Sequence, residues 1–293
     1  MSDFDVKTIK PRKSPLAKRR IQKFCKNPMS VLALIVLSAM ILACAFAPLL
    51  TPYDPAEINV LNKLAPPSPE HPLGCDRMGR DLLARALYGG RWSLAIGILT
   101  SICVNLIGAA LGVVAGYYSG RIDNAIVTLS EFMSLFPTML VIILIAAVSK
   151  VTIVTLILIW SLTGWAGMMR MTRSKVASLK QESFVESCVA NGIPRFSIMF
   201  HHIIPNTTGP IIVNTTMNIA GYILAESSLS FLGYGLDSSI PTWGNLMNAT
   251  KRMDQILSDP IQWIVPGACI LILVLCVNFL GDGLRDAVDS TTR

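Results

Sequence analysis

Apolar residues in this chain gather into long runs that are separated by polar stretches. A helix needs ~20 residues to cross the roughly 30 Å hydrocarbon core of a bilayer, and these runs are close to that length. In lipid every backbone N–H and C=O group must find a partner within its own segment, so such runs form helices. We therefore predict an all-α, polytopic membrane protein with six transmembrane helices, at residues 31–50, 92–117, 132–148, 151–169, 210–232 and 262–280.

The basic residues set the predicted orientation of these helices. Nine of them precede the first run: Lys7, Lys10, Arg12, Lys13, Lys18, Arg19, Arg20, Lys23 and Lys26. Cytoplasmic flanks of membrane helices are enriched in Lys and Arg, so the N-terminus is predicted to be cytoplasmic, and six crossings return the C-terminus to the same side. The stretch between the fourth and fifth runs is also basic and falls on the predicted inner face.

This orientation divides the chain into predicted regions. They are a basic cytoplasmic N-terminal segment (1–30), a first transmembrane helix (31–50), an extracytoplasmic loop (51–91), a domain of five transmembrane helices (92–282) that includes a cytoplasmic loop (170–206), and a cytoplasmic tail (283–293).

Composition supports a membrane protein and narrows its chemistry. The chain is 52% hydrophobic and 15% charged, whereas ordinary soluble domains are about 25% charged. The net charge of +7 lies mainly on the predicted inner face, so we expect no nucleic-acid partner. The seven cysteines lack CxxC spacing, and the histidines lack acids or cysteines at ligand spacing, so we expect no metal site.

Several catalytic motifs are absent from the sequence. There is no GxxxxGK[ST] phosphate-binding loop and not even a Gly-Lys pair, so this polypeptide cannot hydrolyse ATP by that mechanism. Neither HExxH nor GxSxG occurs. We expect no catalytic residues and no cofactor bound by this chain.

The predicted cytoplasmic loop 170–206 is long for a link between two spans. Helix-forming residues up to Asn191 are followed by Gly192, which can adopt positive φ at a helix end, and by Pro194, which suits the start of a second helix. We predict two short helices that meet near Gly192, the second ending at Pro205. The second helix carries apolar residues including Phe196 and Phe200. From physics alone they could enter a groove on a soluble partner or lie on the inner leaflet.

A family resemblance favours the first of these interpretations. Residues 184–192 (FVESCVANG) and 201–206 (HHIIPN) resemble the EAA loop of bacterial ABC importer permeases. The resemblance implies that this loop docks on a separate ATPase, with Ser187 and Cys188 in place of the usual two alanines. The residues expected to couple the chain to the ATPase are Glu186, Gly192, Ile193, Phe196, Phe200, His202 and Pro205.

Two further motifs narrow the resemblance. Residues 71–76 (HPLGCD), 79–81 (GRD) and 91–94 (RWSL) are similar to the segment after the first span in the C-type permeases of dipeptide, oligopeptide and nickel importers. Cys75 and Ala84 depart from the usual Thr and Ser. Residues 226–235 (ESSLSFLGYG) and 241–245 (PTWGN) also match this group.

Polar residues inside the fifth predicted span are the candidates for a pore. Glu226 is the only acid in any predicted span, and a charge in hydrocarbon costs several kcal/mol, so its side chain must face protein or water. Glu226, Asn218 and Asn214 are pore or gate candidates, and a structural role between helices is the alternative. Gly108, Gly112 and Gly116, at four-residue spacing, are interpreted as a ridge for close helix packing.

The resemblance implies a machine in the bacterial cytoplasmic membrane. This chain would pair with a homologous second permease, two ATP-binding subunits that hold ATP and Mg, and an extracytoplasmic solute-binding protein. The expected cargo is short peptides, and nickel or a metal chelate is the alternative. An ion-coupled secondary transporter would need a self-sufficient ion site, which the sequence does not suggest.

Overall fold

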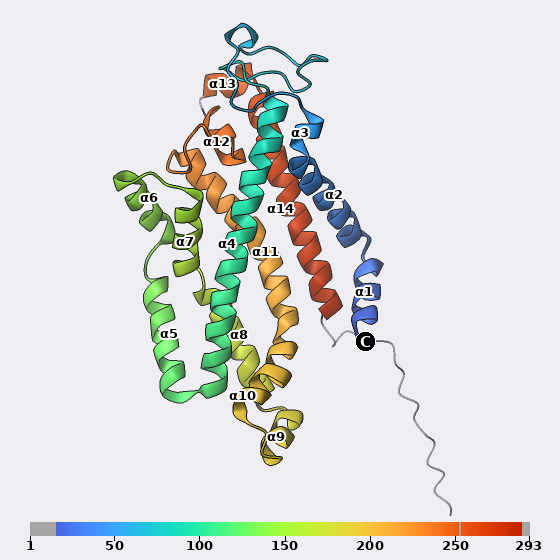
Figure 1. The fold of residues 1–293 in the computed structure, drawn as a ribbon, viewed down its shortest axis with the longest axis vertical. Coiled ribbons are helices and arrows are strands. Elements are labelled where there is room, and N and C mark those ends of the chain that lie inside the picture. The colour runs from blue at the N-terminus through green and yellow to red at the C-terminus, as the bar shows by residue number, and fades with distance from the viewer. Residues whose placement is uncertain (1–15, 252, 289–293) are drawn as a thin grey trace, which may run out of the picture.

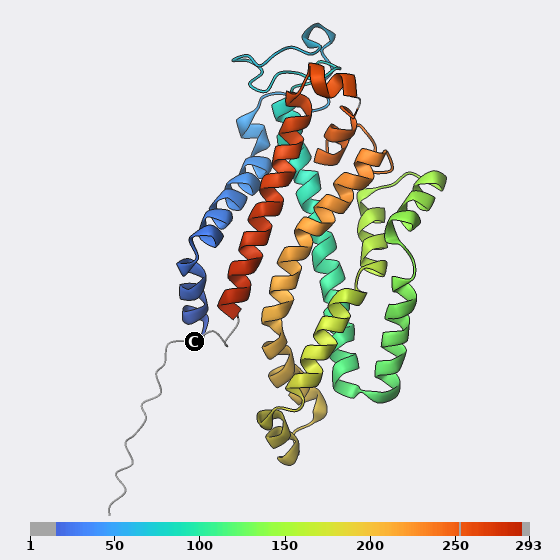
Figure 2. The same cartoon turned by 180° about the vertical axis from the view of Figure 1, so that it is seen from behind.

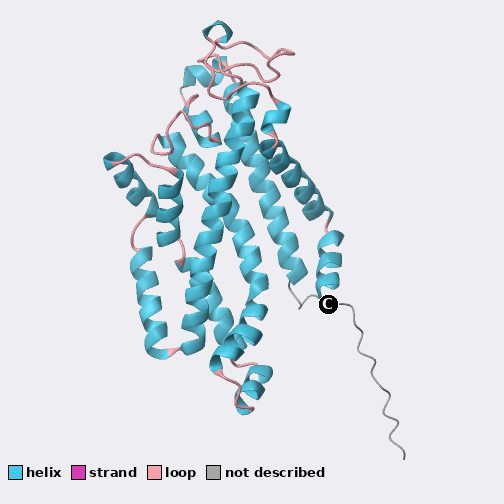
Figure 3. Ribbon diagram, viewed as in Figure 1, coloured by secondary structure: helices cyan, strands magenta, loops and turns pink. Residues whose placement is uncertain are grey.

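A computed structural model describes residues 16–251 and 253–288 of the chain. These residues form helices and connecting loops without a strand, and an isolated β-bridge joins Cys75 and Asp81 (Figure 3). The all-α prediction is therefore confirmed for the described part of the chain. The basic residues Lys7, Lys10, Arg12 and Lys13 and the tail residues 289–293 lie outside the described residues.

Four long helices form the body of the bundle (Figure 1). The central helix is α4 (Leu82–Tyr118), and α11 (Ile204–Leu232) packs along it. Helix α14 (Ile261–Val288) packs on α11 and on α2 (Pro28–Ala45). Helix α1 (Leu16–Lys26) contacts α14, and the short α3 (Ala47–Leu50) follows α2.

The remaining helices are shorter. Helices α5 (Gly120–Ser134), α6 (Thr138–Val148), α7 (Ile153–Thr163) and α8 (Ala166–Leu179) follow α4 and return to pack α8 against it. Next come α9 (Ser183–Ala190), α10 (Arg195–Ile198) and a π-helical turn (Met199–Ile203) that leads into α11. A 3₁₀ turn (Val60–Asn62), α12 (Trp243–Asn248) and α13 (Met253–Ser258) complete the set.

The two ends of the bundle differ in character (Figures 1 and 2). One end, here the cap end, carries the irregular segment 51–81 together with α12 and α13. The opposite end carries α9 and α10, which project beyond the long helices. The segment that contains them, residues 180–203, is called the α9–α10 segment below.

Three helices, α2, α4 and α14, are long and apolar enough by themselves to cross a membrane. Two bent pairs raise the number to five if each pair is one span: α5 with α6, bent by 62°, and α7 with α8, bent by 42°. Helix α11 is long enough to cross a membrane but is not counted with these helices. Its polar residues Asn214, Asn218 and Glu226 interrupt the apolar sequence. The structure thus supports a polytopic membrane protein, and the count of six spans stays a prediction.

The predicted helices at 132–148 and 151–169 are wrong as continuous elements. Pro137 lies in the break between α5 and α6, directly before Thr138, where its ring restricts the preceding residue and removes one backbone donor. Gly164 and Trp165 separate α7 from α8. Helix α8 then extends to Leu179, so helix occupies the first part of the predicted loop 170–206.

The predicted end of a helix at Pro205 is also wrong. Helix α10, the π-helical turn and α11 follow one another without a loop, and Pro205 lies in the first turn of α11. A proline is tolerated there because the N–H groups of a first turn lack partners within their own helix. The apolar residues after Gly192 therefore belong to a helical path that continues into the bundle.

The glycine ridge on α4 is confirmed as a packing surface. A Cβ atom at Gly108, Gly112 or Gly116 would lie 2.6 Å from an atom of α8. The neighbours include the backbone carbonyls of Met169 and Arg173, which cannot move aside as a flexible side chain can. Close approach of α4 and α8 therefore requires residues without side chains at these three positions.

Replacing Gly112 with leucine is expected to destabilise the protein. The new side chain meets the Met169 carbonyl and the Thr172 Cβ atom, and overpacking of this kind costs roughly 1–3 kcal/mol. Gly167→Leu is the matched control, because a Cβ at Gly167 meets nothing within 4 Å. Thermal unfolding of the purified protein in detergent should show a lower midpoint for Gly112→Leu only. Equal midpoints for both variants would contradict the packing role.

Candidate functional site

The α9–α10 segment is organised by a tight turn at Gly192. Helix α9 ends at Ala190, and Gly192 adopts φ +71°, in the left-handed region that favours glycine. The amides of Gly192 and Ile193 donate to the carbonyls of Val189 (3.0 Å) and Cys188 (3.1 Å), which closes the C-terminus of α9. Pro194 then caps α10. The prediction of two short helices meeting near Gly192 is confirmed.

One face of this segment is buried against the bundle. Val185, Ile198 and Ile203 are buried in a cluster with residues of α4 and α8, among them Val113 and Val176. Burial of these aliphatic side chains fixes the segment to the end of the bundle. Ile193 packs against the same cluster.

The opposite face of the segment exposes large apolar side chains. Phe196 is 63% exposed, and its ring lies 4.4 Å from that of Phe200, centroid to centroid. Phe184 and Val189 are also exposed. An exposed aromatic pair beyond the end of a helical bundle is typical of a protein interface.

The residues predicted to couple to an ATPase lie together on this segment and on the start of α11. Glu186, Gly192 and Pro205 are exposed, and His202 is partly buried. Their positions fit a docking surface, while their role stays a prediction.

Two polar links connect this end of the bundle. The Lys180 Nζ group donates to the Tyr117 carbonyl at 2.9 Å and so joins the end of α8 to the end of α4. Arg173 of α8 donates two hydrogen bonds to Asp123 of α5, one of them 2.6 Å long. Paired hydrogen bonds between a guanidinium and a carboxylate fix the relative orientation of both groups. Helix α8 is therefore tied to both of the helices beside it.

A chain of polar side chains joins α4 to α11 within the bundle. The Asn218 amide donates to Asn105 (3.3 Å) and to Asn214 (3.0 Å). Ser101 donates to the Thr215 carbonyl at 2.6 Å. In this subunit the pore candidate Asn218 therefore links α11 to α4, while Asn214 bonds within α11 and lines a cavity of about 380 Å³. Facing a lumen stays a prediction for both.

Glu226 is fully buried where α11 meets α12. Its carboxyl group accepts a hydrogen bond of 2.8 Å from Ser230 Oγ, and Ser227 Oγ lies at 3.5 Å. Gly244 packs directly on the backbone of Ser227, so α12 closes over this part of α11. The side chain thus faces protein, as an acid at this depth must, and the gate role stays a prediction.

The contacts that hold α12 against α4 are made by residues that the sequence did not single out as site candidates. The Trp243 indole donates to the Ala86 carbonyl at 3.0 Å, and the Trp243 amide donates to Ser93 Oγ at 3.1 Å. A Cβ at Gly89 would lie 1.7 Å from the Pro241 carbonyl oxygen, so only glycine allows this approach to α4. Trp243 lies in the matched stretch 241–245, which was the available signal.

No group of three or more His, Cys, Asp or Glu side chains suited to a metal ion occurs within residues 16–251 and 253–288. Near the cap end His71 Nδ1 lies 2.9 Å from Asp81, and Asp81 also caps α4 through the Ala84 amide. These contacts hold the segment 51–81 on the start of α4.

The described residues thus form a polytopic membrane bundle with an exposed apolar segment at one end. The family described as "Binding-protein-dependent transport system inner membrane component" matches residues 108–293. A second family, "N-terminal TM domain of oligopeptide transport permease C", matches residues 14–67. The chain belongs to the family of binding-protein-dependent inner membrane components, and it is a multi-pass protein of the bacterial cytoplasmic membrane.

Curated relatives cover nearly the whole chain. The dipeptide transport system permease protein DppC of Alkalihalophilus pseudofirmus is 38% identical over 264 residues, 90% of this chain and 86% of the relative. The oligopeptide transport system permease protein OppC of Bacillus subtilis is 32% identical over 289 residues, 99% of this chain and 94% of the relative. OppC of Haemophilus influenzae is 35% identical over 279 residues, which are 94% of this chain and 88% of the relative. These relatives are transport permeases, and the predicted family is confirmed.

Replacing Glu226 tests its structural role. Glu226→Leu removes the acceptor of Ser230 and leaves a buried hydroxyl to find another partner, which costs roughly 1–3 kcal/mol. Glu226→Gln keeps an acceptor oxygen and should unfold at nearly the wild-type temperature. The same two changes at the exposed Glu131 of α5 serve as controls. A Leu variant as stable as the Gln variant would contradict the structural role, while a stable Gln variant that loses transport would support the gate role.

Proposed function

We propose that this chain forms half of the membrane pore of an ATP-driven importer for short peptides. It is a permease subunit that pairs with a homologous second permease, two ATP-binding subunits and an extracytoplasmic solute-binding protein. The observation that carries the proposal is the exposed α9–α10 segment in a chain of this permease family.

The proposed topology has six crossings with both termini in the cytoplasm. Counting α2, α4, the pair α5–α6, the pair α7–α8, α11 and α14 gives six, if α11 crosses with its polar side chains turned toward protein. The bond of Asn218 to Asn105 and the full burial of Glu226 support this placement of α11. The basic residues of α1 and α8 then face the cytoplasm, as the positive-inside rule requires.

The energy source lies on the partners in this proposal. The sequence has no phosphate-binding loop, so ATP and Mg bind to the two ATP-binding subunits and not to this chain. The exposed Phe196–Phe200 pair offers an apolar anchor for a groove on such a subunit. Glu186 adds a charge on the same segment.

Movement of the docked segment would reach the membrane helices through the contacts at its base. The buried face of the segment packs on α4 and α8, Lys180 holds Tyr117, and Arg173 holds Asp123. A pull on α9 and α10 would therefore shift α8 and the start of α5 as a group. Rigid movements of this kind, repeated in the second permease, would change the side of the membrane to which the pore opens.

The relatives support a peptide cargo. Their names specify dipeptide and oligopeptide transport, and this group covers the chain almost from end to end. They do not favour nickel or a metal chelate. An ion-coupled secondary transporter, which would transport peptide without any ATP-binding subunit, is a weaker alternative, because the sequence does not suggest the ion site that it would need.

The docking role is tested with two glycines that both have positive φ. Gly192 and Gly120 both have positive φ, and a Cβ at either position meets nothing within 4 Å, so valine strains the backbone of both alike. We expect Gly192→Val to reduce co-purification of the ATP-binding subunits at least severalfold and to lower transport accordingly. Gly120→Val, in the turn between α4 and α5, should retain them. Equal retention by both variants would refute the docking role.

The cargo is tested by uptake into proteoliposomes that contain the whole complex and its binding protein. Labelled dipeptides, longer peptides and nickel are offered with ATP, with a non-hydrolysable analogue and without nucleotide. We expect ATP-dependent uptake of peptides and none of nickel. Peptide uptake by this chain alone, without ATP-binding subunits, would overturn the proposal.

A further inference from the structure

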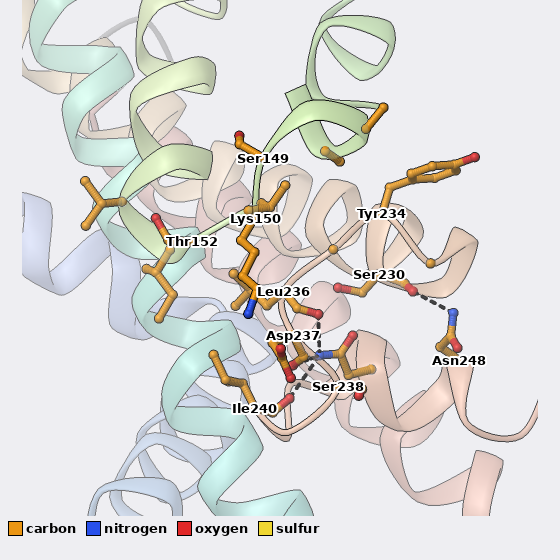
Figure 4. Close-up of a pocket in the computed structure, with 18 of the residues that line it drawn as sticks. Ser149, Lys150, Thr152, Ser230, Tyr234, Leu236, Asp237, Ser238, Ile240 and Asn248 are labelled. Carbon is orange, nitrogen blue, oxygen red and sulfur yellow. Dashed lines mark hydrogen bonds between the residues drawn. The ribbon is translucent and has the colours of Figure 1, made fainter. Parts of the chain in front are cut away.

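A large groove near the cap end takes no part in the docking described above. It has a volume of about 990 Å³ and lies between the α6–α7 hairpin on one side and the loop from α11 to α12 on the other (Figure 4). Ligand sites in proteins are clefts of roughly 300–1,000 Å³, so this groove can hold a molecule of short-peptide size.

The two walls of the groove carry opposite charges. Lys150 lies in the hairpin between α6 and α7, and its amino group points toward the loop that carries Asp237 (Figure 4). Among the described residues, the ion pairs with N···O distances within 4.0 Å do not include Lys150 with Asp237. Each charge is therefore open to a ligand that lies between the walls.

The wall that carries Asp237 is held in place by two asparagines. The Asn245 amide donates to the carbonyls of Leu236, Asp237 and Ile240 at 2.9–3.2 Å. The Asn248 amide donates to the carbonyls of Ser230 and Phe231. These bonds pin the loop to α12 and fix the position of the carboxylate before any ligand binds.

Asp237 itself is oriented by its neighbour. The Ser239 amide donates to Asp237 Oδ1 at 2.9 Å, and this bond holds the pKa of Asp237 below its usual value, with Lys150 adding to the effect. The Ser239 side chain also hydrogen-bonds this carboxylate, which lines the groove and remains exposed to an ammonium ligand.

The rest of the groove is lined by both apolar and small polar side chains. Apolar side chains such as Val151 and Ile153 alternate with the small polar side chains of Ser149 and Ser238. Such a lining can accept varied side chains. A ligand whose two ends carry opposite charges would be recognised by those ends, which short peptides of every sequence have in common.

We propose that this groove is a peptide subsite of the permease, in which Lys150 binds the free carboxylate of a short peptide and Asp237 binds its free ammonium group. The inference rests on the proposed peptide cargo and adds a site on this chain to it. It would explain how a pore subunit accepts many peptide sequences while favouring small molecules with two free ends.

The test uses the assembled complex in nanodiscs without its binding protein, so that recognition by that protein does not contribute. The probe is a dipeptide with a photo-reactive diazirine side chain and two free ends. Its cross-links, mapped by mass spectrometry, should fall in residues 146–154 and 230–248 and should disappear with excess unlabelled dipeptide. Acetylating the amino end or amidating the carboxyl end should lower labelling about tenfold, the effect of losing one charge-assisted hydrogen bond.

Matched variants assign each end of the probe. Lys150→Ala should lower labelling by the free dipeptide about tenfold and abolish the effect of amidation, while Asp237→Ala should abolish the effect of acetylation. Lys251→Ala and Glu70→Ala, exposed residues that do not line the groove, are controls and should label as wild type. Cross-links confined to other segments, or labelling that ignores both end groups, would overturn the proposal.

A comparison of two lipid compositions distinguishes binding of a peptide from binding of a lipid headgroup at the groove. A phosphatidylethanolamine headgroup carries the same two charges, so nanodiscs with and without that lipid are compared. Loss of peptide labelling only when the lipid is present would show competition at the groove and support the site. Lipid binding with no peptide labelling in either kind of nanodisc would overturn the peptide assignment.

A parallel uptake measurement distinguishes failure of the groove proposal from failure of the proposed function. Wild-type peptide uptake by the complete complex is measured in parallel with the cross-linking. Absence of peptide uptake would refute the proposed function, whereas uptake with labelling elsewhere would refute the groove alone.

Discussion

The close contact between α4 and α8 is the constraint on which the rest of the structure depends. Three glycines of α4 allow the two backbones to approach until the carbonyls of Met169 and Arg173 face bare Cα atoms. Without water to satisfy backbone groups, tight van der Waals packing of this kind is a main source of association between membrane helices. Helix α8 leads directly into the α9–α10 segment, so the same contact places that segment under the bundle.

The other end of α4 holds α12 and the end of α2 in place. Gly89 receives the Pro241 carbonyl, Ala86 accepts the Trp243 indole, and Arg91 donates to the carbonyls of Cys44 and Ala45 at the end of α2. One long helix therefore contacts the α9–α10 segment at one end and α12 at the other. In the proposed importer, this continuity would give a movement of the α9–α10 segment a physical path to the groove beside α12.

The sequence was informative where a single residue or a local run decides the structure. Long apolar runs predicted the helices, and Gly192 predicted the turn between α9 and α10 because its backbone needs positive φ. Pro137 is a local signal for the break between α5 and α6, since a proline interior to a predicted span argues against continuity, whereas hydropathy alone does not show this break. The π-helical turn before α11 had no clear local signal.

Contacts between distant positions could not be read in the same way. Arg173 and Asp123 are 50 positions apart, and nothing local to either residue indicates the other. Glu226 was recognised as exceptional from its apolar surroundings, yet only the packing of α12 shows which groups surround it. The charges of Lys150 and Asp237 carried no signal in the sequence, because their meaning depends on two loops facing each other across a groove.

The π-helical turn at Met199–Ile203 has a consequence for the evolution of subunit pairing. Such a turn accommodates one residue more than an α-helical turn of the same length. Deleting one residue there would restore a regular helix and rotate everything before it by about 100° around the axis of α11. That rotation would withdraw Ile198 from the cluster that it shares with α4 and α8, so the direction of the aromatic pair cannot change without loss of this packing. The length of this turn is therefore under selection, since one codon lost or gained there would disrupt the surface that the proposal offers to an ATP-binding subunit.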